Sequence, residues 1–260
     1  MKRLIFSTLI IISGYLIFKG YFVNPSTNVN ESADQQPGIE MPESKPKPVS
    51  FITDPEGRKI AYSFVQSVPE NIRLISNVAS ASDSGAVRDY YGCSSVVNAG
   101  FYTKERTHLG LFQSQTIMYG GRIQSTLVDG FVYTTGDNQL YISSTPPEKP
   151  GSFTLQTGPV VRYNDTLRPL RLITDEFARR VIAATSNIRT AYFIVLYDAE
   201  NVFSGPLLKD VPDIIEKIAT KESIQFTDAI NLDGGSASVF ITTDVALSEL
   251  VPSGGFFCIK

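Results

Sequence analysis

The sequence predicts an α+β fold: a single domain built on a largely antiparallel, mixed β-sheet with one or two packed helices. Short runs of β-type residues separated by turn residues fill most of the chain after residue 58, and only two segments have helical periodicity. The composition agrees, since 42% hydrophobic and 19% charged residues are an ordinary globular balance. A domain of about 210 residues is long enough to bury a full core.

The expected strands share runs of apolar and β-branched residues bounded by Gly, Pro, Asn or Asp. They cover residues 58–66, 71–77, 93–102, 109–143 (a meander of several strands), 153–165 (broken at Gly158-Pro159) and 179–198 (a hairpin). The first two are expected to be neighbours joined by "SVPE". Their alternation of apolar and polar residues is partial, which suits strands that are partly buried on both faces.

One clear helix is expected over residues 211–221. Asp210 is placed to cap it, Pro212 and Asp213 suit its first turn, and apolar residues recur on one face. A second, weaker helix is expected over residues 82–90. Many short strands with one or two helices are typical of the α+β class.

The chain before the domain divides into two segments. Residues 1–23 start with basic residues and continue as an apolar run of membrane-spanning length, so they are expected to be an uncleaved membrane anchor. A cleaved signal peptide is the alternative, which would make the protein secreted. Residues 24–50 are rich in Pro, Ser and Asn and are expected to be a disordered linker. The domain then spans residues 51–260 and is expected outside the cytoplasm, held at the cell membrane by the single N-terminal span.

The cysteine count and the charge limit cofactors and partners. Cys93 and Cys258 are the only cysteines, and in an exported protein they can form a disulfide or remain small buried apolar residues. With two cysteines and one histidine, no cysteine-based metal site is expected, and no cofactor is predicted. The formal net charge of −3, without a block of like charges, argues against nucleic acid as a partner.

Two stretches carry the candidate chemistry. In "NLDGGSAS", residues 231–238, a carboxylate at the end of an apolar run precedes two glycines, which let backbone approach a ligand and can form an anion-binding nest. A tight Asp-Gly-Gly turn is the plain structural alternative. In "VVNAGFY", residues 96–102, Asn98 has the donors and acceptors that suit sugar hydroxyls, and Phe101 or Tyr102 can pack on a sugar ring.

Together the two stretches resemble the phosphodiester glycosidase family, which includes the enzyme that uncovers mannose 6-phosphate. In the family's order of motifs, this chain has "NAGFY" (98–102), "QTGPVV" (156–161), "RVIAA" (180–184) and "NLDGGSAS" (231–238). The resemblance covers about residues 55–260 and includes a helix before the last motif. The family pattern has glycine where this chain has Ala99 and Ser236, and threonine where it has Val181.

The resemblance implies one pocket formed by residues far apart in the sequence. Asp233 and Arg180 are its expected catalytic residues: Asp233 for acid–base chemistry or for orienting the sugar, and Arg180 for the phosphate. The neighbouring Arg179 is expected to be a solvated strand residue. The expected substrate-binding residues are Asn98, Gly100, Phe101, Gly158, Asn231, Gly234, Gly235 and Ser236.

The residue that assists Asp233 stays open at this point. Cleavage of a glycosidic bond typically uses two carboxylates, and Asp137, Asp175 and Glu176 are candidates for the second. His108, the only histidine, can shuttle protons or be structural.

The sequence therefore predicts an exported, membrane-tethered hydrolase that cleaves the linkage between a sugar's anomeric carbon and a phosphodiester. Its expected partners are a sugar phosphodiester or cell-envelope glycan as substrate, and the membrane through the N-terminal segment. The alternative is a surface module that binds carbohydrate or a sugar-phosphate polymer without turnover, which the replacements at Ala99 and Ser236 favour. Release of free sugar distinguishes the two.

Overall fold

The computed structural model describes residues 45, 46 and 48–260, so the predicted membrane anchor and most of the predicted linker lie outside the described residues. The described chain belongs to one folded unit, Met41–Lys260. Neither of the two helices in this part of the chain has the length and apolar character needed to cross a bilayer.

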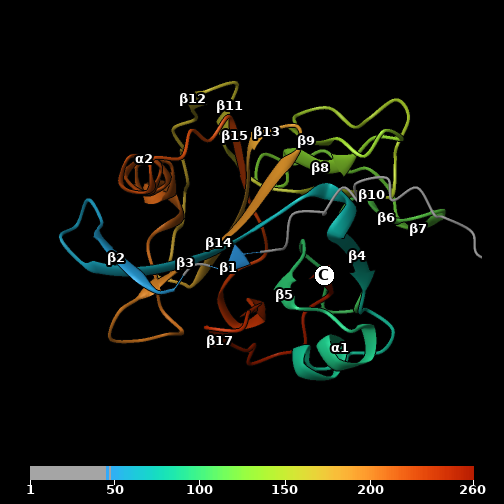
Figure 1. The fold of residues 1–260 in the computed structure, drawn as a ribbon, viewed down its shortest axis with the longest axis horizontal. Helices are drawn as coiled ribbons and strands as arrows, with labels where there is room; N and C mark the ends of the chain where they lie inside the picture. The colour runs from blue at the N-terminus through green and yellow to red at the C-terminus, as the bar shows by residue number, and fades with distance from the viewer. Residues whose placement is uncertain (1–44, 47) are drawn as a thin grey trace, which may run out of the picture. The chain divides into compact units, whose positions relative to one another are not determined.

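Eight strands form the largest sheet, in the order β1-β3-β14-β13-β15-β11-β12, with β2 also paired to β3 (Figure 1). The bounds are β1 Lys45–Pro46, β2 Ser50–Thr53, β3 Lys59–Ser67, β11 Val160–Tyr163, β12 Thr166–Leu167, β13 Arg180–Asn187, β14 Thr190–Asp198 and β15 Asp228–Asn231. The predicted hairpin at 179–198 is confirmed as β13 and β14, which are paired along nearly their whole length.

Two five-stranded sheets complete the domain. One has the order β7-β6-β10-β8-β9 and the other β17-β16-β5-β18-β4. The bounds are β4 Ile72–Ser76, β5 Ser95–Asn98, β6 Phe112–Ser114, β7 Ile117–Gly120, β8 Gly130–Thr134, β9 Leu140–Ser143, β10 Phe153–Thr157, β16 Phe240–Ile241, β17 Ala246–Leu247 and β18 Gly255–Ile259. Every strand pairing among the described residues is antiparallel, so the sheets are not mixed.

The two predicted helices are present and lie away from each other (Figure 1). α1, Ser84–Tyr91, starts where the Asp83 carboxylate accepts a hydrogen bond from the Ala86 N–H and ends at Gly92 in the left-handed conformation. α2, Val211–Glu222, begins as predicted after Asp210, but that side chain makes no capping hydrogen bond. A single 3-10 turn, η2 (Leu208–Asp210), leads into α2 and places Asp210 in a helical conformation, which is incompatible with the extended backbone of a capping residue.

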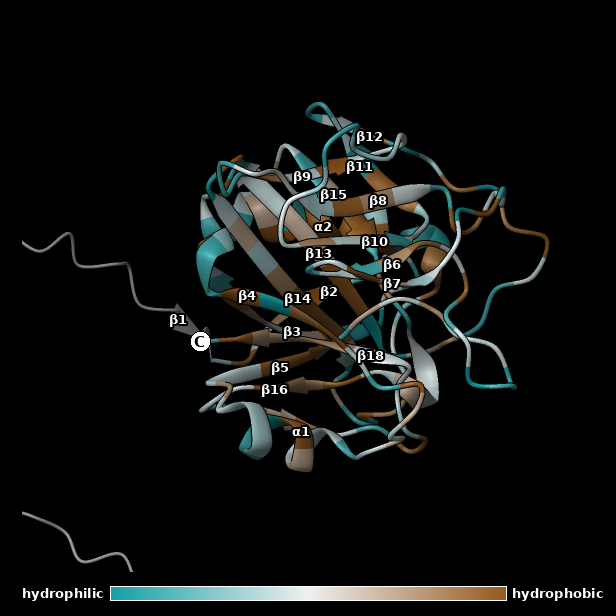
Figure 2. Ribbon diagram, turned by 90° about the vertical axis from the view of Figure 1, so that its right-hand side faces the viewer, coloured by the Kyte–Doolittle hydropathy of each residue, from teal (hydrophilic) through white to brown (hydrophobic). Residues whose placement is uncertain are grey.

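The largest sheet is buried on both faces, and this explains the near-continuous apolar character of its central strands. Ile182 and Ile194 belong to a core cluster that includes the buried face of α2. On the opposite face, Val181 and Val195 belong to a cluster shared with the other two sheets, including Phe257 of β18. Figure 2 shows these central strands as hydrophobic ribbons, as expected for strands without a solvated face.

Cys93 and Cys258 form a disulfide with a Cα–Cα distance of 5.3 Å. Cys93 lies just before β5 and Cys258 lies in β18, and the two strands are neighbours in the third sheet. The alternative of two buried free thiols is therefore wrong. The bond links positions 165 residues apart in the sequence.

Several predicted details of strand order were wrong. β3 and β4, expected to be neighbours, lie in different sheets: β3 pairs with β14, and β4 with β18. The predicted meander is interrupted, because β10 lies between β6 and β8. Strand pairing also begins before residue 51, since β1 pairs with Gln66 and Val65 of β3 and β2 starts at Ser50. The partners of β3 and β4 in β14 and β18 are distant in sequence, and local patterns carry no information about them.

Candidate active site

Two strands bring the predicted catalytic pair together. β13 and β15 are antiparallel partners with Ile182 opposite Asn231, and extending this register by two residues sets Arg180 opposite Asp233. Asp233 follows the end of β15 by two residues, and a Cβ at the next residue, Gly234, would lie 3.5 Å from Arg180 Nη1. The charge of each residue also shifts the pKa of the other. The strand register thus makes neighbours of two motifs that are far apart in the chain.

Arg180 is buried and held from three sides. Its Nη2 donates to the Glu176 carbonyl at 2.6 Å and pairs with the Asp175 carboxylate at 3.2 Å, and its Nε donates to the Pro206 carbonyl at 3.3 Å. A Cβ at Gly234 would lie 3.5 Å from Nη1, so bare backbone adjoins this edge of the guanidinium. Burial lowers the pKa of Arg180, while Asp175, Glu176 and Asp233 oppose this shift.

Asp233 has a strongly perturbed acidity. Burial raises its pKa from 3.8 to about 7, although the Gly234 N–H and the charge of Arg180 both favour the ionised form. One carboxylate oxygen, Oδ1, accepts the Gly234 N–H at 2.8 Å. A carboxyl group with a pKa near 7 exchanges protons readily at neutral pH, which is the property required of a general base.

Asn98 is placed beside Asp233 and its side chain bonds to the backbone, while its predicted binding of sugar hydroxyls stays a prediction. The side chain is fully buried. Its Nδ2 donates to the carbonyls of Asp233 at 2.7 Å and Ala99 at 3.1 Å, and its Oδ1 accepts the Val239 N–H at 2.8 Å. Asn98 therefore clamps both ends of the loop that follows β15, and it positions Asp233.

The two glycines after Asp233 do not form a free anion-binding nest. The Gly234 N–H donates to the Asp233 carboxylate, and the Gly235 N–H donates to the Arg179 carbonyl at 2.9 Å. Gly235 has a φ of +61°, which favours glycine, and a Cβ at Gly234 would lie 3.0 Å from the Arg179 carbonyl. The glycines thus let the loop lie close against the start of β13. Ser236 is exposed on this loop.

Arg179 is the residue that sequence reasoning missed. It is almost completely buried, at 1% exposure, and is not the solvated side chain that was predicted. Its Nε donates to the Ser238 hydroxyl at 2.6 Å, and its Nη2 donates to the carbonyls of Ser238 and Ser248 at 2.6 and 2.7 Å. Burial lowers its pKa to about 10. The only sequence signal was its place next to Arg180 on a strand, where alternate residues face opposite sides.

Three other predicted binding residues support the site from within. Asn231 Nδ2 donates to the Gly158 carbonyl at 2.9 Å and so holds the turn that leads into β11. A Cβ at Gly158 would lie 2.6 Å from the Leu127 carbonyl, and one at Gly100 would lie 3.0 Å from Leu155. Close packing requires both glycines, and none of the three side-chain positions is exposed. Direct substrate binding by these residues stays a prediction.

A pocket of 320 Å³ opens beside Arg180. Apolar walls and two carboxylates surround the guanidinium. The lining residues besides Arg180 are Leu127, Leu172, Thr174, Asp175, Glu176 and Leu208. The pocket has the mixture of apolar surface and a few polar groups that is typical of ligand sites.

The three predicted second carboxylates have different environments. Asp175 is engaged by backbone, because it accepts the N–H groups of Leu208 and Lys209 at 2.9 Å each in addition to the contact with Arg180. Asp137 lies in the turn between β8 and β9 and is absent from the pocket lining. Glu176 is exposed in the pocket, and none of the described residues forms an ion pair with its carboxylate. No described group of three or more His, Cys, Asp or Glu side chains is arranged to hold a metal ion.

Of the two predicted aromatic residues, Tyr102 is close enough to Asp233 for the charge of Asp233 to shift its pKa. Burial and the charge of Asp233 both raise the pKa of the Tyr102 hydroxyl, whereas Arg106 lowers it. The guanidinium of Arg106 lies 5.1 Å from the Tyr102 ring. Phe101 is half-buried, and its carbonyl accepts the Leu109 N–H.

His108 is structural. Its Nε2 lies 2.8 Å from the Ser76 hydroxyl, and its ring stacks on Phe112 with centroids 3.7 Å apart. Burial and the charge of Arg106 lower its pKa to about 4, so it stays neutral near pH 7. A neutral, stacked imidazole is poorly suited to carry protons to the site.

Comparison with known proteins identifies the family to which the chain belongs. A sequence model described as phosphodiester glycosidase matches residues 91–255. The chain belongs to the phosphodiester glycosidase family. The resemblance inferred from the four motifs is thereby confirmed, and glycosidase-type hydrolysis is the activity with which the family is associated. No curated protein matches the sequence.

Solved structures share the fold of this phosphodiester glycosidase family member. The catalytic domain of zebrafish N-acetylglucosamine-1-phosphodiester alpha-N-acetylglucosaminidase, auto-inhibited by its pro-peptide, has a TM-score of 0.61 at 15% identity, with 85% of this chain and 84% of that chain covered. A hypothetical protein from Synechocystis has a TM-score of 0.56 at 12% identity, with 85% and 64% covered. At these identities the likeness is one of fold.

Proposed function

We propose that the protein is an exported hydrolase that cleaves a sugar-1-phosphodiester. The observation that carries the proposal is that Arg180 at the start of β13 and Asp233 just after β15 are close enough for each charge to shift the pKa of the other, and that Arg180 lines a pocket, although Asp233 is not part of its lining. Membership of the phosphodiester glycosidase family supports the same reaction class.

Arg180 is the proposed ligand for the phosphate. Three of its sides are fixed by Asp175, Glu176 and Pro206, so the guanidinium is already oriented when substrate arrives. Its Nη1 lies against the bare backbone of Gly234, and among the described residues no hydrogen bond engages Nη1, which leaves this nitrogen available to a ligand. A planar guanidinium stabilises the charge that builds on the departing phosphate.

Asp233 is the proposed base. A phosphate monoester leaves as an anion whose second pKa is about 6, so it needs no proton at the moment of departure. The attacking water does need to lose one, and an ionised carboxylate with a pKa of about 7 can accept it. Water oxygen then bonds to the sugar, the ester bond breaks, and phosphate carries away the bonding electrons while Asp233 holds the proton.

Glu176 is the proposed second carboxylate. Of the three candidates, it is the one that lines the pocket without being engaged by backbone N–H groups. From there it can accept hydrogen bonds from the sugar or from the attacking water.

The proposal that the protein is exported rests on two features. The Cys93–Cys258 disulfide is typical of oxidising compartments outside the cytoplasm. The basic start and apolar run of residues 1–23 support a membrane anchor, or a secretion signal if that segment is cleaved. Sugar-phosphate polymers of the cell envelope would be within reach of such a protein.

The alternative function is binding without turnover, and the positions at which this chain departs from the family pattern give it little support. Ala99 and Val181 are both fully buried in the core, where they do not face the pocket. Ser236 is the single replacement that is exposed.

The test is to incubate the purified full-length protein with a panel of sugar-1-phosphodiesters, including an α-N-acetylglucosamine phosphodiester. Release of free sugar is expected with at least one member. Heavy-oxygen water then locates the broken bond, because label appears in the sugar after carbon–oxygen cleavage and in the phosphate after phosphorus–oxygen cleavage. Saturable binding of several members without release of sugar would establish the binding module instead.

A further inference from the structure

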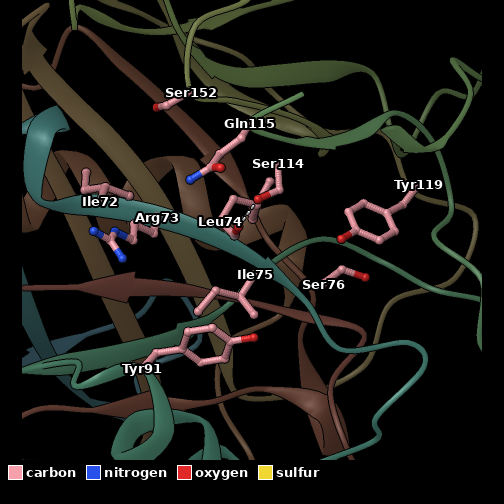
Figure 3. A pocket seen from close by; sticks show the side chains of 10 residues that line it. All are labelled: Ile72, Arg73, Leu74, Ile75, Ser76, Tyr91, Ser114, Gln115, Tyr119 and Ser152. Carbon is pink, nitrogen blue, oxygen red and sulfur yellow. Dashed lines mark hydrogen bonds between the residues drawn. The ribbon is translucent and has the colours of Figure 1, made fainter. Parts of the chain in front are cut away.

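A second pocket runs along β4, separate from the pocket beside Arg180 (Figure 3). We name it the β4 groove. It has a volume of 240 Å³ and is floored by residues 72–76. One wall is Tyr91 at the end of α1, and the other is the β6–β7 hairpin with Ser114, Gln115 and Tyr119. Nothing in the proposed hydrolytic reaction uses this groove.

The floor of the β4 groove is a free strand edge. Among the described strands, β4 pairs only with β18. The Leu74 carbonyl turns away from β18 and accepts the Ser114 hydroxyl at 2.6 Å. In an antiparallel strand the N–H and C=O of one residue point to the same side, and this side alternates along the chain. The peptide groups of Ile72, Leu74 and Ser76 therefore face the groove and offer donors and acceptors to a ligand.

The shape of the groove favours a small polar ligand over an extended peptide. A docking strand would need the Leu74 carbonyl in the middle of the edge, and the Ser114 side chain already occupies it. The volume of 240 Å³ is also below the range of about 300–1,000 Å³ that is usual for drug-sized ligands. A single sugar unit is the class of ligand that fits both limits.

The side chains of the β4 groove match a sugar that carries negative charge. Tyr91 and Tyr119 are 39% and 44% exposed, and they lie on the two sides of β4 (Figure 3). Each offers an apolar ring with a polar tip. Among the described residues that line the groove, Arg73 is the one that carries a charge, and none is a carboxylate. A guanidinium in a lining without carboxylates favours phosphate.

We propose that the β4 groove binds a phosphate-bearing sugar unit. The ring packs against the two tyrosines, its hydroxyls bond to the free edge of β4, and the phosphate pairs with Arg73. Figure 3 shows Arg73 toward one end of the strand and Tyr119 toward the other, so ring and phosphate have separate contacts.

The groove would serve as a second subsite for a polymer. Ser76 lines the groove and contacts His108, whose backbone forms a β-bridge with Tyr102. In this role one unit of a sugar-phosphate chain would occupy the groove while another reacts, and the role as a subsite rests on the proposed function. Binding energy gained at such a remote unit can be used to position the reacting unit.

The test uses a fluorescent reporter placed in the groove. The chain has no Trp, so Tyr119→Trp in the full-length protein introduces the only indole and keeps an aromatic ring. Glucose 6-phosphate, glucose and inorganic phosphate are titrated separately. A saturable change is expected with glucose 6-phosphate, with affinity about tenfold or more above that for glucose, because a charge-assisted contact is gained.

Two further variants locate the site. Arg73→Gln in the Tyr119→Trp background is expected to reduce the affinity for glucose 6-phosphate to that for glucose. Arg88→Gln is the matched control, because Arg88 is an arginine of α1 that pairs with Asp89 and does not line the groove. The proposal is overturned if no titration saturates, or if Arg73→Gln binds glucose 6-phosphate as tightly as the Arg88→Gln control does.

The outcomes separate the groove from the hydrolytic site. Sugar release from a phosphodiester by the wild-type protein, without groove binding, overturns the second subsite and leaves the proposed hydrolase. Groove binding in a protein that releases no sugar supports the binding site and refutes the hydrolase together with the subsite role.

Discussion

Replacing Asp233 with asparagine is expected to separate catalysis from stability. Asparagine keeps the shape of the side chain, and its carbonyl oxygen can still accept the Gly234 N–H that lies 2.8 Å from Oδ1. The substitution removes the basicity that proton transfer requires. Turnover of a sugar phosphodiester is therefore expected to fall by about 100-fold or more, while the fold is retained.

The same substitution is expected to raise the free energy of unfolding at alkaline pH. Because burial raises the pKa of Asp233 from 3.8 to about 7, the folded protein binds this proton more tightly than the unfolded chain does. Ionising Asp233 therefore costs stability progressively as the pH rises from 3.8 to about 7. At 1.36 kcal/mol for each pKa unit, the cost above pH 7 reaches about 4 kcal/mol at most.

Denaturant unfolding of the wild-type and Asp233→Asn proteins at about pH 4 and about pH 8 measures this cost, and turnover is measured in parallel. The two proteins are expected to differ little near pH 4, whereas the variant should be more stable by about 2–4 kcal/mol near pH 8. Equal differences at both pH values, or full turnover by the variant, would refute the assignment of Asp233 as a base with a raised pKa.

Three further changes test the support around the site. Arg180→Lys is expected to weaken substrate binding by about tenfold or more despite keeping the charge, because one ammonium cannot reproduce paired donors. The KM for the substrate measures this loss, and an unchanged KM would contradict the prediction. Asn98→Ala should destabilise the fold by about 1–3 kcal/mol and lower kcat, since the backbone groups of Asp233 and Val239 lose their partner. A variant with the same free energy of unfolding as the wild type would refute the role of Asn98 in holding this loop. Removing the disulfide by Cys93→Ser should cost about 5 kcal/mol on the chain-entropy model, given the separation of 165 residues. A reducing agent should then destabilise the wild type and leave the variant unaffected.

The strand content and the two helices were predictable because they depend on local periodicity. The run at 179–198 shows a hairpin by its own pattern, and α2 shows an apolar face. Strand order was a different matter. β3 and β4 are adjacent in sequence, yet each finds its partner far along the chain, and the pairing energy that decides this is absent from a local pattern.

The sequence motifs predicted which residues lie near the site better than they predicted the role of each residue. Asp233 and Arg180 could be placed together from their motifs, but the direction of the Asn98 amide could not, because it depends on which backbone groups of the folded loop need partners. Arg179 and Arg180 are chemically identical and adjacent. The strand sends one to the loop and the other to the pocket, so only the register tells them apart.

The pH dependence of kcat/KM for the wild-type protein tests most directly whether Asp233 is the base. The profile on a sugar phosphodiester is expected to rise with pH and level off above a midpoint near 7, since the ionised carboxylate is the active form and its pKa is about 7. The residual activity of Asp233→Asn should lack that midpoint. A wild-type rate that stays constant through pH 7, or a midpoint that persists in the variant, would contradict proton transfer by Asp233.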